Sequence, residues 1–492
     1  MIRAYSVDSV RAAEQELMAS LQEGELMLRA ARGLAEVVRS RAAQQGGRTV
    51  AVLVGGGNNG GDGLFAAVDL AGDHRVQILY VGEEIHHDGS TAARAAHVPL
   101  IGLERSNTTL PPEAVEVLAG ADIVLDALTG IGGRAGLSGA MRALVESIDD
   151  DSYLVAADLP SGVDPSGHRI GAGAVFADET VTLGVAKPVH LLPVTEPAVG
   201  LLTVVDIGLQ MDDVTAAVER MEHDDVASMW PVPSARDQKY TRGVVGIIAG
   251  SDTFPGAAIL ATTSAVESGA GMVRYTGPAQ ATAHVIAAAP EAVPASGRVQ
   301  AWVLGPGVDP EATDEAGRVQ VAAITEALES DDPCVVDAGA LALFDYPRNA
   351  PTLLTPHAGE LAVFLTNWPG HEEVTREQVE AAPVAYAHAA AQASGATMLL
   401  KGASTVVAVP DEGMPIRIAS SAPAWLATAG AGDVLAGLCG TLLAAGLSPR
   451  DAGSLAALVH GIAADDANPG GPLRALRVAR AIPTTVARLL NR

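Results

Sequence analysis

Thr49-Val-Ala-Val-Leu-Val54, followed by Gly55-Gly-Gly-Asn-Asn-Gly-Gly-Asp62-Gly63, is the stretch that decides the fold of the first half of this chain. The apolar residues predict a buried strand. The glycines after it allow positive φ angles and let bare N–H groups approach a ligand. The asparagines and Asp62 then supply side chains for selectivity, so we expect a ligand-binding turn at the end of this strand.

The same stretch contains a G-x-G-x-x-G match at Gly55, Gly57 and Gly60, which is a weak sign of dinucleotide binding when it stands alone. Two features count against the ordinary form of that motif. The next apolar run, residues 75–81, does not end in a well-placed ribose-binding acid, and Asp62 would repel a pyrophosphate unless a cation sat nearby. We interpret the stretch as a modified nucleotide loop with an associated cation.

Length and composition limit the classes of protein to consider. A chain of 492 residues exceeds what one core usually supports, so we expect two domains, residues 1–224 and 225–492, joined through an acidic region at residues 210–233. The net charge of -27 argues against nucleic-acid and anionic-membrane partners, and no stretch is long enough for a membrane span. The two cysteines are too few for a disulfide framework, which favours a cytoplasmic protein.

Apolar runs separated by Ala-rich helical segments recur along both halves, which is typical of doubly wound α/β domains with parallel sheets. An amphipathic helical region is expected at about residues 8–41. In such folds the binding loops collect at the carboxyl ends of the strands. The first series of runs comprises residues 49–54, 76–81, 123–128, 153–159, 180–183 and 201–207, and the second comprises 243–249, 272–275, 301–304, 334–336, 352–354, 397–400, 405–409 and 416–418.

Polar side chains follow two later runs of the first half, where Asp126 precedes a glycine-rich loop and Asp158 precedes Ser161. Asn59, Asp126 and Ser161 can together offer amide, carboxylate and hydroxyl oxygens, a set suited to a monovalent or alkaline-earth ion. Asp158 is left as a candidate acid or base. The alternative is that each acid only caps a helix or turn, but the convergence of three strand ends favours a site.

Most of residues 1–210 resembles the NAD(P)H-hydrate epimerases in Asn58-Asn-Gly-Gly-Asp62, in Asp126 to Gly130 and in Asp158-Leu-Pro-Ser161. The resemblance implies a Rossmann-like domain in which Asp158 is catalytic and Asn59, Asp126 and Ser161 hold potassium. The residues that it implies contact the hydrated nucleotide are Asn58, Asn59, Gly60, Gly61, Asp62, Gly130, Ile131, Gly132, Gly133, Arg134, Ala135, Gly136 and Asp158.

The second half has a glycine turn, Gly430-Ala-Gly432, followed by Asp433 and an apolar stretch. Orphan N–H groups beside a carboxylate can stabilise a transferring phosphoryl group and accept the proton of an attacking hydroxyl. An acid at a helix start is also an ordinary cap, although caps rarely need such glycines ahead of them. Lys401-Gly-Ala-Ser-Thr405 is a plausible phosphate cradle, and His357 is either a site residue or a structural histidine.

Residues 235–492 resemble ribokinase-like proteins and, more narrowly, the ADP-dependent NAD(P)H-hydrate dehydratases, through patterns such as Gly305-Pro-Gly307, Thr355-Pro-His357-Ala-Gly-Glu360 and Gly430-Ala-Gly-Asp433. The resemblance implies that Asp433 is the catalytic base. It implies contacts to the hydrate from Ala257, Gly307, His357 and Asp433, and contacts to the adenine nucleotide from Lys401, Gly402, Ala403, Ser404, Thr405 and Gly432.

The order of the two halves resembles the bifunctional NAD(P)H-hydrate repair enzymes of bacteria, with no domain left over. That resemblance implies NADH and NADPH hydrates as substrates, potassium in the first half, and ADP and magnesium in the second. We also expect a homo-oligomer. Two other readings stay open at this point: a fused small-molecule or vitamin kinase that releases a stable phosphorylated product, and a nucleotide sensor without turnover.

Overall fold

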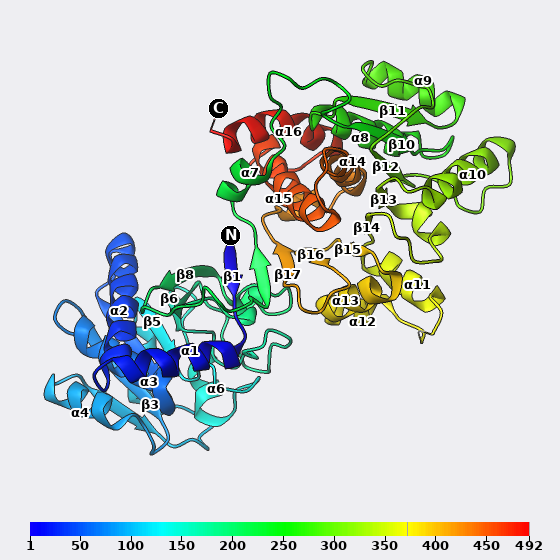
Figure 1. Ribbon diagram of the computed structural model, residues 1–492. Helices are drawn as coiled ribbons and strands as arrows, with labels where there is room; N and C mark the ends of the chain where they lie inside the picture. Colours follow the sequence, from blue (N-terminus) through cyan, green and yellow to red (C-terminus); the bar gives the residue numbers. More distant parts are fainter. Residues whose placement is uncertain (371, 492) are drawn as a thin grey trace. The chain divides into compact units, whose positions relative to one another are not determined.

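The structure, a computed structural model, describes residues 1–370 and 372–491. The chain forms two compact units: one comprises Arg3–Val218, and the other comprises Glu219–Arg492 together with Met1–Ile2 (Figure 1). Two short strands, β1 (Ile2–Ala4) and β9 (Val218–Arg220), lie where the chain passes from one unit to the other. Each unit is described separately below.

The unit Arg3–Val218 contains a parallel sheet in the order β4-β3-β2-β5-β6-β7-β8. The chain starts in the middle of the sheet at β2, builds outward through β3 and β4, and then returns to place β5 on the other side of β2. Its strands are β2 (Thr49–Val54), β3 (Arg75–Val81), β4 (Leu100–Leu103), β5 (Ile123–Ala127), β6 (Tyr153–Ala157), β7 (Glu179–Leu183) and β8 (Leu201–Val205). The reversal of strand order between β2 and β5 opens a crevice at their carboxyl ends, where ligands bind in doubly wound sheets.

Strand β2 is buried on both faces because successive side chains point to opposite sides of the sheet. Val50, Val52 and Val54 pack with helices α2 and α3, whereas Ala51 and Leu53 pack with α5 and α6. Helices therefore cover both faces, as the continuous apolar run predicts. The helices of this unit are α1 (Val7–Ser20), α2 (Glu25–Gln45), α3 (Gly57–Leu70), α4 (His87–Ala95), α5 (Pro112–Ala119) and α6 (Gly139–Val145), with the 3-10 turns η1 (Pro188–His190) and η2 (Glu196–Ala198).

The second unit contains a mixed sheet in the order β9-β17-β16-β15-β14-β13-β12-β10-β11. Pairing is parallel from β11 to β15 and antiparallel from β15 to β17. The strand order reverses between β10 and β12, and positions of this kind are where ligands bind in doubly wound sheets. The strands are β10 (Val244–Ile248), β11 (Met272–Thr276), β12 (Ala301–Leu304), β13 (Cys334–Val336), β14 (Thr352–Leu354), β15 (Thr397–Leu400), β16 (Thr405–Ala408) and β17 (Ile416–Ala419).

The core of this unit forms where α8, α14, α15 and α16 pack with the strands. Both cysteines, Cys334 and Cys439, are buried in the reduced form. Among the described residues, no helix has the length and apolar character needed to cross a membrane. The helices are α7 (His223–Met229), α8 (Pro255–Glu267), α9 (Ala279–Ala288), α10 (Glu315–Glu329), α11 (Ala358–Asn367), α12 (Arg376–Ala381), α13 (Pro383–Ser394), α14 (Ala431–Ala444), α15 (Pro449–Ala467) and α16 (Ala475–Leu489), with the 3-10 turns η3 (Ala338–Leu343) and η4 (Ala424–Leu426).

The predicted fold class is confirmed, although several details differ from the expectation. The helical region expected at residues 8–41 is two helices, because the chain breaks between Ser20 and Glu25, where Gly24 is left-handed with φ of 78°. Strand β4 is short and was not expected from the sequence. Residues 58–62, expected in a loop, form the first turns of helix α3.

Candidate functional sites

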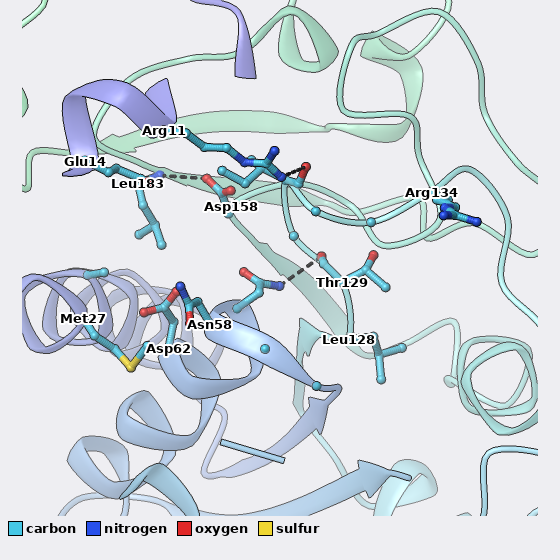
Figure 2. A pocket seen from close by; sticks show the side chains of 18 of the residues that line it. Arg11, Glu14, Met27, Asn58, Asp62, Leu128, Thr129, Arg134, Asp158 and Leu183 are labelled. Atoms are coloured by element: carbon cyan, nitrogen blue, oxygen red, sulfur yellow. Dashed lines mark hydrogen bonds between the residues drawn. The ribbon is translucent and has the colours of Figure 1, made fainter. Parts of the chain in front are cut away.

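A cavity of about 1190 Å³ opens at the carboxyl ends of β2 and β5 in the unit Arg3–Val218 (Figure 2). Loops or turns after β2, β5 and β6 contribute to it, together with helices α1 and α2. The predicted residues that line it are Asn58, Asn59, Asp62, Gly130, Ile131, Gly132, Gly133, Arg134, Gly136 and Asp158. The structure therefore brings together most of the residues proposed for the first site. Five of them are not among the lining residues: Gly60, Gly61, Asp126, Ala135 and Ser161.

Glycines after β2 are required by close packing. A Cβ on Gly55 would lie 1.9 Å from the Leu128 carbonyl oxygen, and one on Gly60 would lie 2.1 Å from the Gly55 carbonyl oxygen. These contacts set the turn between β2 and α3 directly against the loop after β5. Residues 56–59, at the start of α3, line the cavity, and the start of a helix favours anionic ligand groups.

Asn59, Asp126 and Ser161 converge through the backbone of Thr129. The Asn59 Nδ2 donates to the Thr129 carbonyl oxygen at 3.0 Å, and the Thr129 N–H donates to Ser161 Oγ at 2.8 Å. Ser161 donates both its N–H and its hydroxyl to the Asp126 carboxylate, at 2.8 and 2.7 Å. Burial raises the pKa of Asp126 to about 6, although these hydrogen bonds from Ser161 oppose the increase.

The Asn59 Oδ1 is buried and has no hydrogen-bond partner among residues 1–370 and 372–491. A buried amide oxygen without a partner is unfavourable unless something occupies its lone pairs. Together with the Asp126 carboxylate and the Thr129 carbonyl, this oxygen makes a hard-oxygen donor set. The residues present fit a cation at this position.

Asp158 is held by a buried lysine, Lys187. The Lys187 side chain is 1% exposed, and its Nζ donates to Asp158 Oδ1 at 2.5 Å, to Thr182 Oγ1 at 3.0 Å and to the Leu183 carbonyl oxygen at 3.1 Å. Asp158 itself has a left-handed backbone with φ of 65°, which is uncommon outside glycine. A strained residue that aims a charged group into a cavity is typical of functional sites.

His190 fixes the backbone of Asp158 from behind. The Lys187 N–H donates to His190 Nδ1 at 2.9 Å, so Nε2 carries the proton and donates to the Asp158 carbonyl oxygen at 2.8 Å. Burial and the positive charge of Lys187 together lower the pKa of His190 to about 4, although Asp158 opposes the decrease. His190 is therefore a neutral positioning residue.

Two further carboxyl groups line the same end of the cavity. Burial raises the pKa of Asp62 well above its usual value, and the negative charges of Asp158 and Glu14 add to this effect while Lys187 opposes it. Figure 2 shows Asp62 on α3 and Asp158 at the end of β6 extending into the cavity from different elements, with Arg134 farther along the loop after β5. The cavity thus has three carboxyl groups, Glu14, Asp62 and Asp158, and it is also lined by three arginines, Arg11, Arg105 and Arg134.

The second candidate site surrounds Lys401 at the end of β15. Its Nζ lies 2.7 Å from Asp337 Oδ1 and 3.6 Å from Glu360 Oε2. A Cβ on Gly432 would lie only 3.3 Å from the same ammonium group, which places Lys401 against the first turn of α14, beside Asp433. Burial would lower the pKa of Lys401, but Asp337 and Glu360 outweigh it and the pKa is raised. Lys401 is therefore a fixed positive charge.

Asp433 lies in the first turn of α14, which begins at Ala431 immediately after the left-handed Gly430 (φ 88°). A Cβ on Gly430 would come within 2.4 Å of Leu260 Cδ1, so only glycine fits this turn. Burial raises the pKa of Asp433 to about 7; Asp337 and Glu360 add to the increase, and Lys401 opposes it. A carboxyl group with this pKa can accept a proton near neutral pH.

The remaining residues predicted for the second site lie on several different loops and helix starts of the second unit. Ala257 and Gly307 are neighbours, because a Cβ on Gly307 would lie 2.6 Å from the Ala257 Cβ. Residues Gly402, Ala403 and Ser404 form the turn between β15 and β16. His357 caps helix α11, accepting from the Glu360 N–H at 3.1 Å, and its side chain is 59% exposed.

Sequence reasoning missed Glu14, and it missed Asp337, which is buried between Lys401 and the Thr355 hydroxyl. Asp337 carries the same signal that identified Asp126 and Asp158, an acid directly after an apolar run. Glu14 carries no comparable signal.

Comparisons with known proteins find relatives of both halves of the chain. Residues 245–483 match the family model described as NAD(P)H-hydrate dehydratase, and residues 23–189 match the one described as YjeF-related protein N-terminus. The chain is 41% identical to the bifunctional NAD(P)H-hydrate repair enzyme Nnr of Mycobacterium leprae, over 99% of each chain. It is 42% identical to the protein of the same description from Mycobacterium tuberculosis, over 91% of this chain and 90% of that one. A solved ADP/ATP-dependent NAD(P)H-hydrate dehydratase from Bacillus subtilis, co-crystallized with ATP/Mg2+, is 27% identical, with a TM-score of 0.47 over 55% of this chain and 97% of that chain.

Proposed function

The chain belongs to the bifunctional NAD(P)H-hydrate repair enzymes, and from this membership we propose which residues carry its two reactions. The protein repairs hydrated NADH and NADPH by epimerisation and by dehydration. We assign epimerisation to a domain of residues 1–224 and dehydration to a domain of residues 225–492. The compact units divide the chain slightly earlier, between Val218 and Glu219.

The proposed dehydration converts a poor leaving group into a good one. Hydroxide leaves C6 of the hydrated ring with difficulty, so phosphorylation of that hydroxyl by ADP would allow phosphate to leave instead. Asp433 takes the hydroxyl proton. The N–H groups of the Gly430–Gly432 turn stabilise the transferring phosphoryl group, and Lys401 balances its charge.

The remaining contacts follow from the positions around Asp433. The hydrate lies against Ala257, Gly307, His357 and Asp433. Magnesium, when bound, neutralises charge on the phosphoryl oxygens, and the hard carboxylate oxygens of Asp337 and Glu360 suit that ion. The adenine nucleotide is held by Lys401, Gly402, Ala403, Ser404, Thr405 and Gly432.

The observation that carries this proposal concerns the start of helix α14. Asp433, with its pKa of about 7, lies in the first turn of this helix, and the Lys401 ammonium group lies against the same turn. The test is to incubate the full chain with a mixture of hydrate epimers, with and without ADP and magnesium. We expect both epimers to be restored to NAD(P)H, with one inorganic phosphate released per turnover. Accumulation of a stable phosphorylated product would instead identify a small-molecule kinase.

For the first domain we propose that Asp158 is the acid or base of epimerisation at C6. Potassium would be held by Asn59, Asp126 and Ser161, where the unpartnered Asn59 oxygen supports the assignment. That ion would supply a fixed positive charge near the substrate. The residues Asn58–Asp62 and Gly130–Gly136 form the proposed contacts to the hydrated nucleotide. We further propose a cytoplasmic homo-oligomer without nucleic-acid or membrane partners.

A further inference from the structure

Helix α1 contributes a carboxyl group, Glu14, to the cavity of the first unit. The helix lies outside residues 23–189, which match the family model, and Ser6 caps its start by accepting from the Ser9 N–H at 3.1 Å. Its inward face is marked by Val10, which is fully buried, and by Leu17, which is partly buried. Glu14 lies on this same face by helical spacing. An apolar residue would pack better there, so the carboxyl group calls for a functional explanation.

Lys187, the positive charge that acts most strongly on Glu14, does not donate a hydrogen bond to its carboxyl group. Lys187 has three N–H donors, and all three are used by Asp158, Thr182 and Leu183. Among residues 1–370 and 372–491, no group donates a hydrogen bond to the Glu14 carboxyl, and Arg11 on the same helix donates instead to the Ile131 carbonyl oxygen at 3.3 Å. Asp158 is thus an ion-paired carboxylate, while Glu14 lacks a hydrogen-bonded cation.

Burial favours the protonated form of Glu14, and the surrounding charges act in both directions. Burial raises its pKa, Asp158 raises it further, and Lys187 and Arg11 oppose the increase. Asp62, which lines the cavity from α3, also has its pKa raised well above the usual value by burial, and the negative charges of Asp158 and Glu14 add to the increase. The cavity therefore combines a carboxylate paired with a lysine, Asp158, with a carboxyl group that has no paired cation and whose pKa burial raises, Glu14. This is the combination that acid–base catalysis requires.

We propose that Glu14 is the second proton-transfer residue of the epimerase, acting with Asp158; this inference rests on the epimerase function proposed above. Glu14 donates its proton to the C6 hydroxyl oxygen. The C6–O bond breaks with its electron pair on the departing water, and the lone pair of the ring nitrogen forms a C6=N bond. C6 is then planar.

Water adds to the other face of C6 to complete the inversion. Its oxygen forms the new C6–O bond, the C6=N π pair returns to nitrogen, and the released proton passes to the Asp158 carboxylate. One water leaves and one enters, while one proton moves from Glu14 to Asp158. A turnover in the opposite direction, or proton exchange with solvent, restores the starting state.

The test compares Glu14→Gln with Glu16→Gln in the full chain. Glu16 is an exposed carboxylate on the same helix that does not line the cavity. A single hydrate epimer is supplied without ADP in oxygen-18 water, and chromatography and mass spectrometry follow its conversion and its oxygen label. We expect Glu14→Gln to lower kcat about 10²-fold with little change in KM, and to slow label incorporation equally. Glu16→Gln should match the wild type.

The pH profile separates catalysis from a structural role. The wild-type rate should fall at high pH as Glu14 loses its proton, and Glu14→Gln should lack that decline, whereas Glu14→Asp should restore it with part of the rate. Wild-type kcat in Glu14→Gln, or a change confined to KM, would overturn the proposal. Epimerisation without oxygen-18 incorporation would also overturn it. If the wild-type chain did not interconvert the epimers at all, the epimerase function itself would be wrong.

Discussion

Replacing Asp433 with asparagine should abolish dehydration and at the same time stabilise the folded protein. The raised pKa suits this group for catalysis, but it also means that ionising the group destabilises the folded state. The pKa of Asp433 is raised from 3.8 to about 7. At 1.36 kcal/mol per pKa unit, ionising the folded group costs at most about 4 kcal/mol. The folded state binds this proton more tightly than the unfolded state, so the stability contributed by the protonated carboxyl is lost as pH rises through about 7.

Thermal and denaturant unfolding at several pH values measure this effect. At pH 8 we expect Asp433→Asn to have a larger free energy of unfolding than the wild type, by roughly 2 kcal/mol, since partial exposure reduces the full value. The difference should disappear as pH falls toward 3.8. A variant less stable than the wild type at pH 8 would refute the electrostatic reasoning.

The activity of the same variant should change in the opposite direction. Loss of a general base lowers the rate about 10²- to 10⁴-fold, measured as ADP-dependent recovery of reduced nicotinamide, while epimer interconversion continues. Wild-type dehydration should rise about tenfold between pH 6 and pH 8 as Asp433 ionises. Asp337→Asn removes a charge that raises the pKa of Asp433, so any residual activity should shift to lower pH. A profile unmoved by Asp337→Asn would attribute the pH dependence to another group.

Three other substitutions test the structure. Lys187→Met removes a buried cation 2.5 Å from Asp158, so we expect a loss of about 3–5 kcal/mol in unfolding free energy and loss of epimerisation; calorimetry and epimer analysis check both. Replacing potassium with lithium should slow epimerisation in the wild type, and Asn59→Leu should abolish this ion sensitivity; equal sensitivity in both proteins would contradict the cation site. Gly430→Ala introduces a Cβ 2.4 Å from Leu260 Cδ1 at φ of 88°, so dehydration should be lost with about 1–3 kcal/mol of stability, and unchanged kinetics would show that the turn can adjust.

The strands were largely predictable because continuous apolar runs have few alternatives in a chain of this size. Residues 49–54, 301–304 and 397–400 begin and end as expected. Strand β4 was missed because Leu100–Leu103 is short, lies at the sheet edge and is only partly buried. The antiparallel pairing of β16 and β17 was also missed, since local sequence carries little information about the direction of the neighbouring strand.

The residues of the candidate sites also differ in how far the sequence could identify them. Asn59, Asp126 and Ser161 were identified because each lies at or just after the carboxyl end of a strand, and the carboxyl ends of parallel strands meet at one edge of the sheet. Asp337 follows β13 and was recoverable by the same rule. Glu14 was not, because its position depends on how α1 packs across the cavity, and no periodicity in residues 7–20 specifies that packing.

The left-handed backbone at Asp158 affects how the activities of variants are interpreted when this residue is replaced by each of the other amino acids. Asparagine and glycine tolerate φ near 65°, whereas most other side chains cost on the order of 1 kcal/mol there. Inactive variants would therefore fall into two groups. In the first, only the ionisable carboxylate is lost; in the second, the Asp158 backbone carbonyl that accepts from His190 is also displaced. Asparagine belongs to the first group, which makes it the informative replacement, and an alanine scan would overstate the chemical contribution of the carboxylate.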